Sequence, residues 1–189
     1  MSRPVNTIRA SAGAARAACL ALPLALVVSC TGSDGWRTAS RAAAGLAPTP
    51  EEEQGAVIQC YAAPVWGWRG WFADHTWIAL KGRAADSYTV YEVIGWRARR
   101  GLPTLRIERD IPDRLWYGSR PRLLADLRGA AAAELLEKVD AAARRYPYPD
   151  QYRQFPGPNS NTFTAWIARE VPELGLKLSS RAIGKGYLD

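Results

Sequence analysis

Chemistry in this chain would centre on its single histidine, His75, and on a serine at the start of a predicted helix, Ser160. A serine hydroxyl is a poor nucleophile unless an adjacent base takes its proton, and His75 supplies the only imidazole. A carboxylate would orient that imidazole. We expect Glu92 rather than Asp74 in this role, because adjacent strand residues point to opposite faces and Asp74 would point away from His75. The pattern predicts a hydrolase or acyltransferase site with Ser160 as nucleophile, His75 as general base and Glu92 as orienting group.

The residues beside Ser160 favour such a site. Asn159 is a natural N-cap, so Ser160 would lie at a helix N-terminus, where unpaired N–H groups and the helix dipole favour negative charge. The backbone N–H of Ser160 and the side chain of Asn159 would stabilise an oxyanion, and Asn161 would help to shape the site. The alternative is structural, because Asn and Ser side chains also fix turns by local hydrogen bonds. His75 would then be a strand histidine that bonds to the backbone.

The small numbers of histidine and cysteine exclude several kinds of site. One His and three Cys cannot build a zinc finger, a di-metal histidine site or a disulfide scaffold. We therefore expect no metal and no cofactor. Cys60 falls within a predicted strand, where neither a helix N-terminus nor a cation would activate its thiol, so we expect it to be inert.

The N-terminal residues have the pattern of a secretory signal. Residues 1–29 contain three arginines and no acid, and they end in an apolar run, residues 17–29, that is too short to span a membrane. The sequence Val27-Val28-Ser29-Cys30 resembles a bacterial lipoprotein lipobox. This resemblance implies that Cys30 is diacylated, becomes the mature N-terminus and anchors the protein in the membrane of the cell envelope, in an unspecified leaflet. The alternatives are an ordinary signal peptide and an uncleaved anchor.

The charge of the chain also depends on this segment. Removal of residues 1–29 lowers the net charge from +7 to +4, because the segment carries three arginines and no acid. The remaining basic residues are dispersed, so we expect no nucleic-acid partner. Residues 30–55 are rich in Gly, Ala, Ser and Pro and predict a flexible tether. Residues 56–189 would form a single domain.

The elements of that domain predict an α+β fold, in which a small antiparallel sheet packs with helices. Short connections favour antiparallel pairing, since a parallel crossover needs a dozen or more residues. Leucines after Pro121 predict a helix that ends at Gly129, and a longer helix follows at about 131–146. A last helix begins after Asn159 and ends before Pro172. The predicted strands are 56–63, 74–81, 88–96 and 104–108.

Aromatic residues are dense between the first two predicted strands. Trp66, Trp68 and Trp71 lie in the loop 64–72. Such residues usually pack within the loop or on the core. The alternative is a groove that binds a lipid, a glycan or a peptide.

Two resemblances extend these interpretations. The segment Gly157-Pro158-Asn159-Ser160-Asn161-Thr162-Phe163 is similar to the N-C-N-x-F segment of circularly permuted papain-like hydrolases, the PPPDE and NlpC-like proteins. In that fold a histidine on an early strand precedes a cysteine nucleophile that opens a later helix. His75 and Ser160 match these two positions in order, but serine stands in place of cysteine. Hydroxyl chemistry would replace thiol chemistry, or the site would be inert.

The chain from residue 36 to residue 188 also resembles the bacterial domain-of-unknown-function family 3750, through His75-Thr76-Trp77-Ile78, 91–96 and 158–163. This resemblance implies no activity, only an envelope-associated bacterial protein. The sequence therefore predicts two alternative functions. One is a hydrolase or acyltransferase that acts on an envelope peptide, lipid ester or glycan. The other is a catalytically inert lipoprotein that uses the aromatic loop as a binding module.

Overall fold

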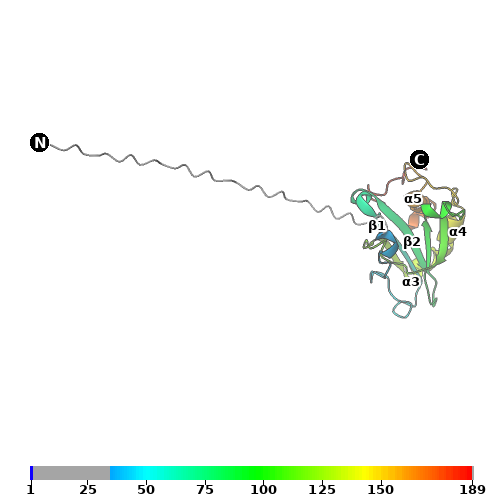
Figure 1. Ribbon diagram of the computed structural model, residues 1–189. Helices are drawn as coiled ribbons and strands as arrows, with labels where there is room; N and C mark the ends of the chain where they lie inside the picture. The colour runs from blue at the N-terminus through cyan, green and yellow to red at the C-terminus, as the bar shows by residue number, and fades with distance from the viewer. Residues whose placement is uncertain (2–34, 189) are drawn as a thin grey trace. The chain divides into compact units, whose positions relative to one another are not determined.

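A computed structural model describes Met1 and residues 35–188 (Figure 1). The predicted signal peptide, apart from Met1, and the predicted lipidation site, Cys30, lie outside the described residues. Within the described residues, no helix has the length and the hydrophobicity needed to cross a membrane.

The fold is α+β, as predicted. Five antiparallel strands form one sheet in the order β4-β3-β2-β1-β5. The strands are β1 (Val57–Pro64), β2 (Asp74–Lys81), β3 (Thr89–Val93), β4 (Leu105–Arg109) and β5 (Arg122–Arg128). The helices are α1 (Gly35–Thr38), α2 (Gly95–Ala98), α3 (Gly129–Ala133), α4 (Leu136–Arg144) and α5 (Ser160–Glu170), with short 3₁₀ turns η1 (Gly67–Trp71) and η2 (Pro172–Leu174).

Side-chain alternation along the strands gives the sheet two buried faces. The helix face is covered by α4 and α5 (Figure 1). α5 packs against β2 and β3, and α4 packs against α5. Its core includes Ile58 and Ile78 from the strands and Phe163 from α5. The loop face is covered by irregular chain and includes Trp77 and Trp116. Alternate residues of each strand therefore place their side chains on opposite faces, one in the core under the helices and the next in the core under the loops.

Part of the predicted tether lies on the loop face. The backbone N–H of Ala44 donates to the carbonyl of Asp113 at 3.2 Å, and the N–H of Leu46 donates to the Asp113 carboxylate at 2.6 Å. Ala43 also forms an isolated bridge with Arg114. Residues 43–46 are therefore held on the domain, and the domain boundary at residue 56 stays a prediction.

The predicted helix between Pro121 and Gly129 is wrong, because residues 122–128 form strand β5. β5 pairs with the otherwise open edge of β1, from Val57 to Ala62, so sheet completion overrides the helical spacing of the leucines. Gly129 then turns the chain into α3 with a φ of 62°, which a residue with a side chain rarely adopts. The long helix predicted at 131–146 is also divided, into α3 and α4.

Candidate functional site

His75 is the second residue of β2, and its side chain lies on the loop face, beside Trp77. It is buried, and its ring stacks on Trp116 with the centroids 3.6 Å apart and the planes 11° from parallel. Its Nε2 atom lies 3.1 Å from Oε2 of Glu92. The expected contact with Glu92 rather than Asp74 is present. Asp74 points the other way, as strand alternation requires.

Asp74 is occupied elsewhere. Its carboxylate accepts hydrogen bonds from Arg122 at 2.6 Å and from Arg181 at 3.1 Å. These contacts connect the start of β2 to β5 and to the C-terminal segment. They also balance the negative charge of Asp74, which among residues 35–188 is the only acid that lines the cavity described below.

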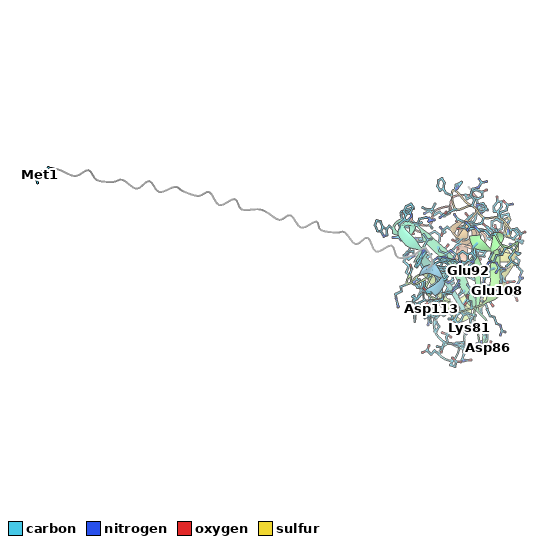
Figure 2. The ribbon with its side chains drawn as sticks, viewed as in Figure 1. Met1, Lys81, Asp86, Glu92, Glu108 and Asp113 are labelled. Atoms are coloured by element: carbon cyan, nitrogen blue, oxygen red, sulfur yellow. The ribbon has the colours of Figure 1, made fainter. Side chains whose placement is uncertain are left out.

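Glu92 is a fully buried carboxylate with two arginine partners. Its Oε1 atom lies 2.5 Å from Arg114 and 2.7 Å from Arg106. Burial by itself would raise the pKa of Glu92, but the hydrogen bond from His75 and the two guanidinium groups outweigh it and lower the pKa to about 2. Glu92 is therefore ionised at neutral pH. In Figure 2, Glu92 lies well away from the turn between β2 and β3, where Asp86 is labelled.

An ionised Glu92 fixes the tautomer of His75. A carboxylate only accepts hydrogen bonds, so Nε2 of His75 carries the proton that it donates to Glu92. Burial lowers the pKa of His75, and the contact with Glu92 offsets this only in part, so the ring is neutral at pH 7. Its Nδ1 atom then bears a lone pair and makes no hydrogen bond within residues 35–188. Nδ1 is the nitrogen that a ligand in the adjoining cavity can reach.

The turn before α5 is built on Asn159. Its Oδ1 accepts from the backbone N–H groups of Asn161 at 2.9 Å and Thr162 at 3.2 Å, and the Thr162 hydroxyl completes a capping box. Its Nδ2 donates to the carbonyls of Gln154 and Ile183, each at 3.1 Å. The whole amide of Asn159 is thus committed to backbone groups. In this arrangement it holds the turn and has no free donor for an oxyanion.

Asn161 joins α5 to the start of β2. Its Nδ2 donates to the carbonyl of Asp74 at 3.0 Å and to that of Ile183 at 2.9 Å, and its Oδ1 accepts from the hydroxyl of Thr76 at 2.9 Å. Thr76 also donates to the carbonyl of Ser160 and to the hydroxyl of Thr164. Asn161 therefore fixes the helix N-terminus against the strand.

Ser160 itself keeps its donors available. It is buried at 5% exposure, yet its hydroxyl makes no hydrogen bond to any residue that the structure describes. Its backbone N–H is the first of α5 and so has no partner within the helix. Both groups belong to a residue that lines the cavity.

His75 and Ser160 do not form a hydrogen-bonded pair in residues 35–188. Thr76 directly follows His75 in β2, and its side chain points toward α5. Because side chains alternate along a strand, His75 points to the opposite face of the sheet, beside Trp77. The two residues nevertheless line one cavity. In the described part of the chain, β3 pairs with β2 only from Ile78 to Leu80, so the ladder stops before it reaches His75.

The cavity has a volume of about 770 Å³, within the range typical of small-molecule sites. Among residues 35–188, eight of its 21 lining residues are tryptophan, tyrosine or phenylalanine. Trp66 and Trp68 line it as members of the aromatic loop, whereas Trp71 does not and is 86% exposed. The other aromatic lining residues are Phe72, Trp96, Trp116, Tyr117, Tyr152 and Phe155.

Sequence reasoning missed most of this wall and both arginine partners of Glu92. Trp116, Tyr117, Tyr152 and Phe155 come from loops that are distant in the sequence, and no periodic pattern marks them. A signal did exist for the arginines. A glutamate in a strand with an otherwise apolar pattern needs a buried cation, because an unpaired buried charge is too costly.

The environment of Cys60 and the grouping of possible metal ligands also bear on the chemistry of the domain. Cys60 is fully buried in β1, and burial raises the pKa of its thiol to about 12. This matches the environment expected for an inert thiol. Within residues 35–188, no three His, Cys, Asp or Glu side chains are grouped as metal ligands.

Comparison with known proteins identifies the family of the chain. No curated protein and no solved structure matches the chain, so the similarity to permuted papain-like hydrolases stays a prediction. A family model described as "Protein of unknown function (DUF3750)" matches residues 55–187, which is more than half of the chain. The chain therefore belongs to the DUF3750 family.

Proposed function

We propose that this domain binds an apolar ligand in its aromatic cavity and holds one polar group of that ligand between His75 and Ser160. The observation that carries the proposal is the wall itself, in which eight aromatic residues lie together with His75 and Ser160. Within residues 35–188, Nδ1 of His75 and the hydroxyl of Ser160 make no hydrogen bond. Sites of this composition bury the apolar body of a ligand and orient it by a few hydrogen bonds.

The polar groups restrict which ligand atoms fit. Nδ1 of His75 is an acceptor, because Glu92 fixes the proton on Nε2, so the ligand must present an N–H or O–H group there. The hydroxyl and the N–H of Ser160 can donate to a carbonyl oxygen. An acyl or aryl group attached to an amide or to a hydroxylated ester satisfies both requirements.

The charges favour a neutral ligand body. Glu92 is balanced by Arg106 and Arg114, and Asp74 by Arg122 and Arg181. His75 is neutral at pH 7. Arg69 also lines the cavity, but it is exposed to solvent. An ion placed beside His75 and Ser160 would therefore lose its hydration without gaining an unpaired opposite charge there.

Dye binding tests this proposal. N-phenyl-1-naphthylamine is apolar, neutral and has one N–H donor, and its fluorescence rises on burial. We expect the full chain to bind it, and Trp116→Ala and His75→Phe to weaken binding at least tenfold. Trp71→Ala is the matched control, because Trp71 is a tryptophan of the same loop that does not line the cavity. Unchanged binding in both cavity variants would contradict the proposal.

Catalysis by Ser160 is the second candidate, because its hydroxyl is free at a helix N-terminus in the cavity that also contains the neutral imidazole. Nδ1 of His75 would take the hydroxyl proton, directly after closure or through one water. The Ser160 oxygen would then bond to an acyl carbon while the leaving group departs with that proton. Water would release the acyl group by the reverse proton path, or another acceptor would take it.

A fluorophosphonate probe separates the two candidates. A hydrolase or acyltransferase would be labelled on Ser160, and labelling would be lost in Ser160→Ala and in His75→Ala. A pure binding module would remain unlabelled, and Ser160→Ala would keep its dye affinity. Labelling that survives Ser160→Ala would contradict the catalytic candidate.

We also propose that the protein is a lipoprotein of the bacterial cell envelope, anchored through Cys30. The support is the charge and hydropathy pattern of residues 1–30. Mass spectrometry of protein purified from a bacterial host with a lipoprotein pathway tests it. We expect an N-terminal peptide that begins at an acylated Cys30, and an unmodified Cys30 would contradict it.

A further inference from the structure

The mouth of the cavity is surrounded by exposed aromatic side chains. Trp68 is 67% exposed, Trp71 86% and Phe155 74%, and Trp66 and Phe72 are about half exposed. Scattered single apolar side chains on a surface need no explanation. These five are concentrated at one place, because four of them line the same cavity and Trp71 belongs to the same 3₁₀ turn as Trp68. Such a patch indicates an interaction surface.

The same rim carries positive charge. We define the rim as residues 65–73, 94–102 and 151–156, which contain five arginines and no acid. Asp74 and Asp150 directly adjoin these segments, and Asp74 is buried and paired with Arg122 and Arg181. Arg97 pairs with Glu108. The other four are exposed and form no ion pair within residues 35–188: Arg69, Arg99, Arg100 and Arg153. By contrast, exposed Arg144 and Arg145 on and after α4 both pair with acids.

Tryptophan combined with unpaired arginine suits one kind of partner. Tryptophan rings are stable at the boundary between water and hydrocarbon, because one end is apolar and the other has an N–H donor. Basic side chains near a membrane that contains anionic lipids each contribute about 1 kcal/mol. A protein partner would more often be met by charges of both signs, which fix its register, and the rim has charges of one sign.

The course of the chain leads to the same side of the domain. The described domain begins at Gly35, where an added Cβ would lie 3.4 Å from the ring of Trp66. Cys30 precedes Gly35 by five residues, a length of chain that spans at most about 18 Å. An acyl chain on Cys30 would therefore reach a bilayer that touches the rim.

We propose that the rim docks on the surface of a bilayer that contains anionic lipids, and that the cavity opens toward that surface. The docking contact belongs to the domain and does not require the acyl anchor. The further statement that the cavity takes its apolar ligand from the bilayer rests on the proposed function. The ligand class then narrows to a membrane lipid or a lipid-linked molecule.

Hydrogen–deuterium exchange of the full chain tests the docking. Cys30→Ser removes the lipidation site from every protein compared, and vesicles of phosphatidylcholine are compared with vesicles that contain phosphatidylglycerol. We expect slower exchange in the rim segments when phosphatidylglycerol is present. Exchange is measured separately for each segment, so lipid binding by residues 1–29 does not obscure protection of the rim. No slowing in these segments with either vesicle would overturn the proposal, and equal slowing with both would overturn its anionic part.

Two double substitutions test whether the rim is the surface that docks. Since each arginine contributes about 1 kcal/mol near anionic lipid, Arg99→Gln with Arg100→Gln should raise the lipid concentration for half-maximal protection by about tenfold or more. Arg144→Gln with Arg145→Gln changes the net charge equally and should leave it within about twofold. Equal effects of the two pairs would show attraction to net charge alone and would overturn the rim as the docking site.

Trp71→Ser separates this inference from the proposed function. The substitution should weaken vesicle protection of the rim and leave the affinity for N-phenyl-1-naphthylamine unchanged. If vesicle protection is absent while the dye still binds, the docking fails and the ligand cavity remains. If the dye does not bind while the rim is still protected, the cavity proposal fails and the docking remains.

Discussion

Replacing Glu92 by glutamine should strongly destabilise the domain. The side chain has three close partners: His75 at 3.1 Å, Arg106 at 2.7 Å and Arg114 at 2.5 Å. Glutamine keeps the shape but removes the charge. Among residues 35–188, Arg114, whose side chain is 1% exposed, would then retain only Asp110, at 3.6 Å, as an opposite charge.

Two arguments give a similar magnitude. Removal of one partner from a buried ion pair costs about 3–5 kcal/mol, because the other charge stays buried without compensation. The pKa of Glu92 falls from 4.5 to about 2 on folding, and a shift of that size corresponds to about 3 kcal/mol in favour of the ionised form. The loss is large compared with the usual 5–15 kcal/mol of domain stability.

Urea unfolding of the full chain, followed by circular dichroism, measures this effect. Glu108→Gln is the matched control, because Glu108 pairs with Arg106 at 3.0 Å but its side chain is 50% exposed, and exposed pairs contribute about 1 kcal/mol at most. Adding Arg114→Met to Glu92→Gln should restore part of the loss, since the unpaired charge is removed. A change below about 1 kcal/mol for Glu92→Gln would refute the reasoning.

Three further results are expected. Asn159→Ala should cost about 1–2 kcal/mol in urea unfolding, because the Asn159 Oδ1 accepts hydrogen bonds from two backbone N–H groups. Ser160→Ala should stay within about 0.5 kcal/mol, and equal costs would contradict the hydrogen bonding described. Cys60 should resist a water-soluble disulfide reagent in the native protein and react in urea, and native reaction would contradict its burial. The unfolding free energy should fall as pH drops below 6.5, because unfolded His75 takes up a proton that the folded form resists. Below pH 4.5, Glu92 adds to this loss until about pH 2, and His75→Phe should flatten only the part of the curve nearer neutral pH.

Local rules predicted the part of the site that depends on local geometry. The choice of Glu92 over Asp74 needed only strand alternation and neighbouring strands, and the N-cap at Asn159 needed only its residue type before an apolar helix. β5 could not be predicted in this way, because the leucines between Pro121 and Gly129 fit either period. The open edge of β1 decided between them, and that is a tertiary effect.

The position of His75 relative to Ser160 also required the structure. The order of the two residues matches the permuted hydrolase pattern, but order does not state the face on which a strand side chain lies. Thr76 occupies the helix face, so a shift of one residue in β2 would be needed for His75 to face α5. Both residues nevertheless border the cavity, whose lining includes the start of β2 and the end of β3, beyond the paired residues of the two strands.

The partner of Nδ1 therefore distinguishes the two proposed functions. If the cavity is a binding site, Nδ1 of His75 accepts a hydrogen bond from the ligand, and methylation of the dye nitrogen should remove that contact. N-methyl-N-phenyl-1-naphthylamine should bind the native protein several-fold more weakly than the parent dye and should bind His75→Phe with the same affinity as the parent dye. If Nδ1 instead serves the Ser160 hydroxyl, the ligand donor is not needed. Equal affinity of the two dyes for the native protein, combined with fluorophosphonate labelling of Ser160, would then favour catalysis over binding alone.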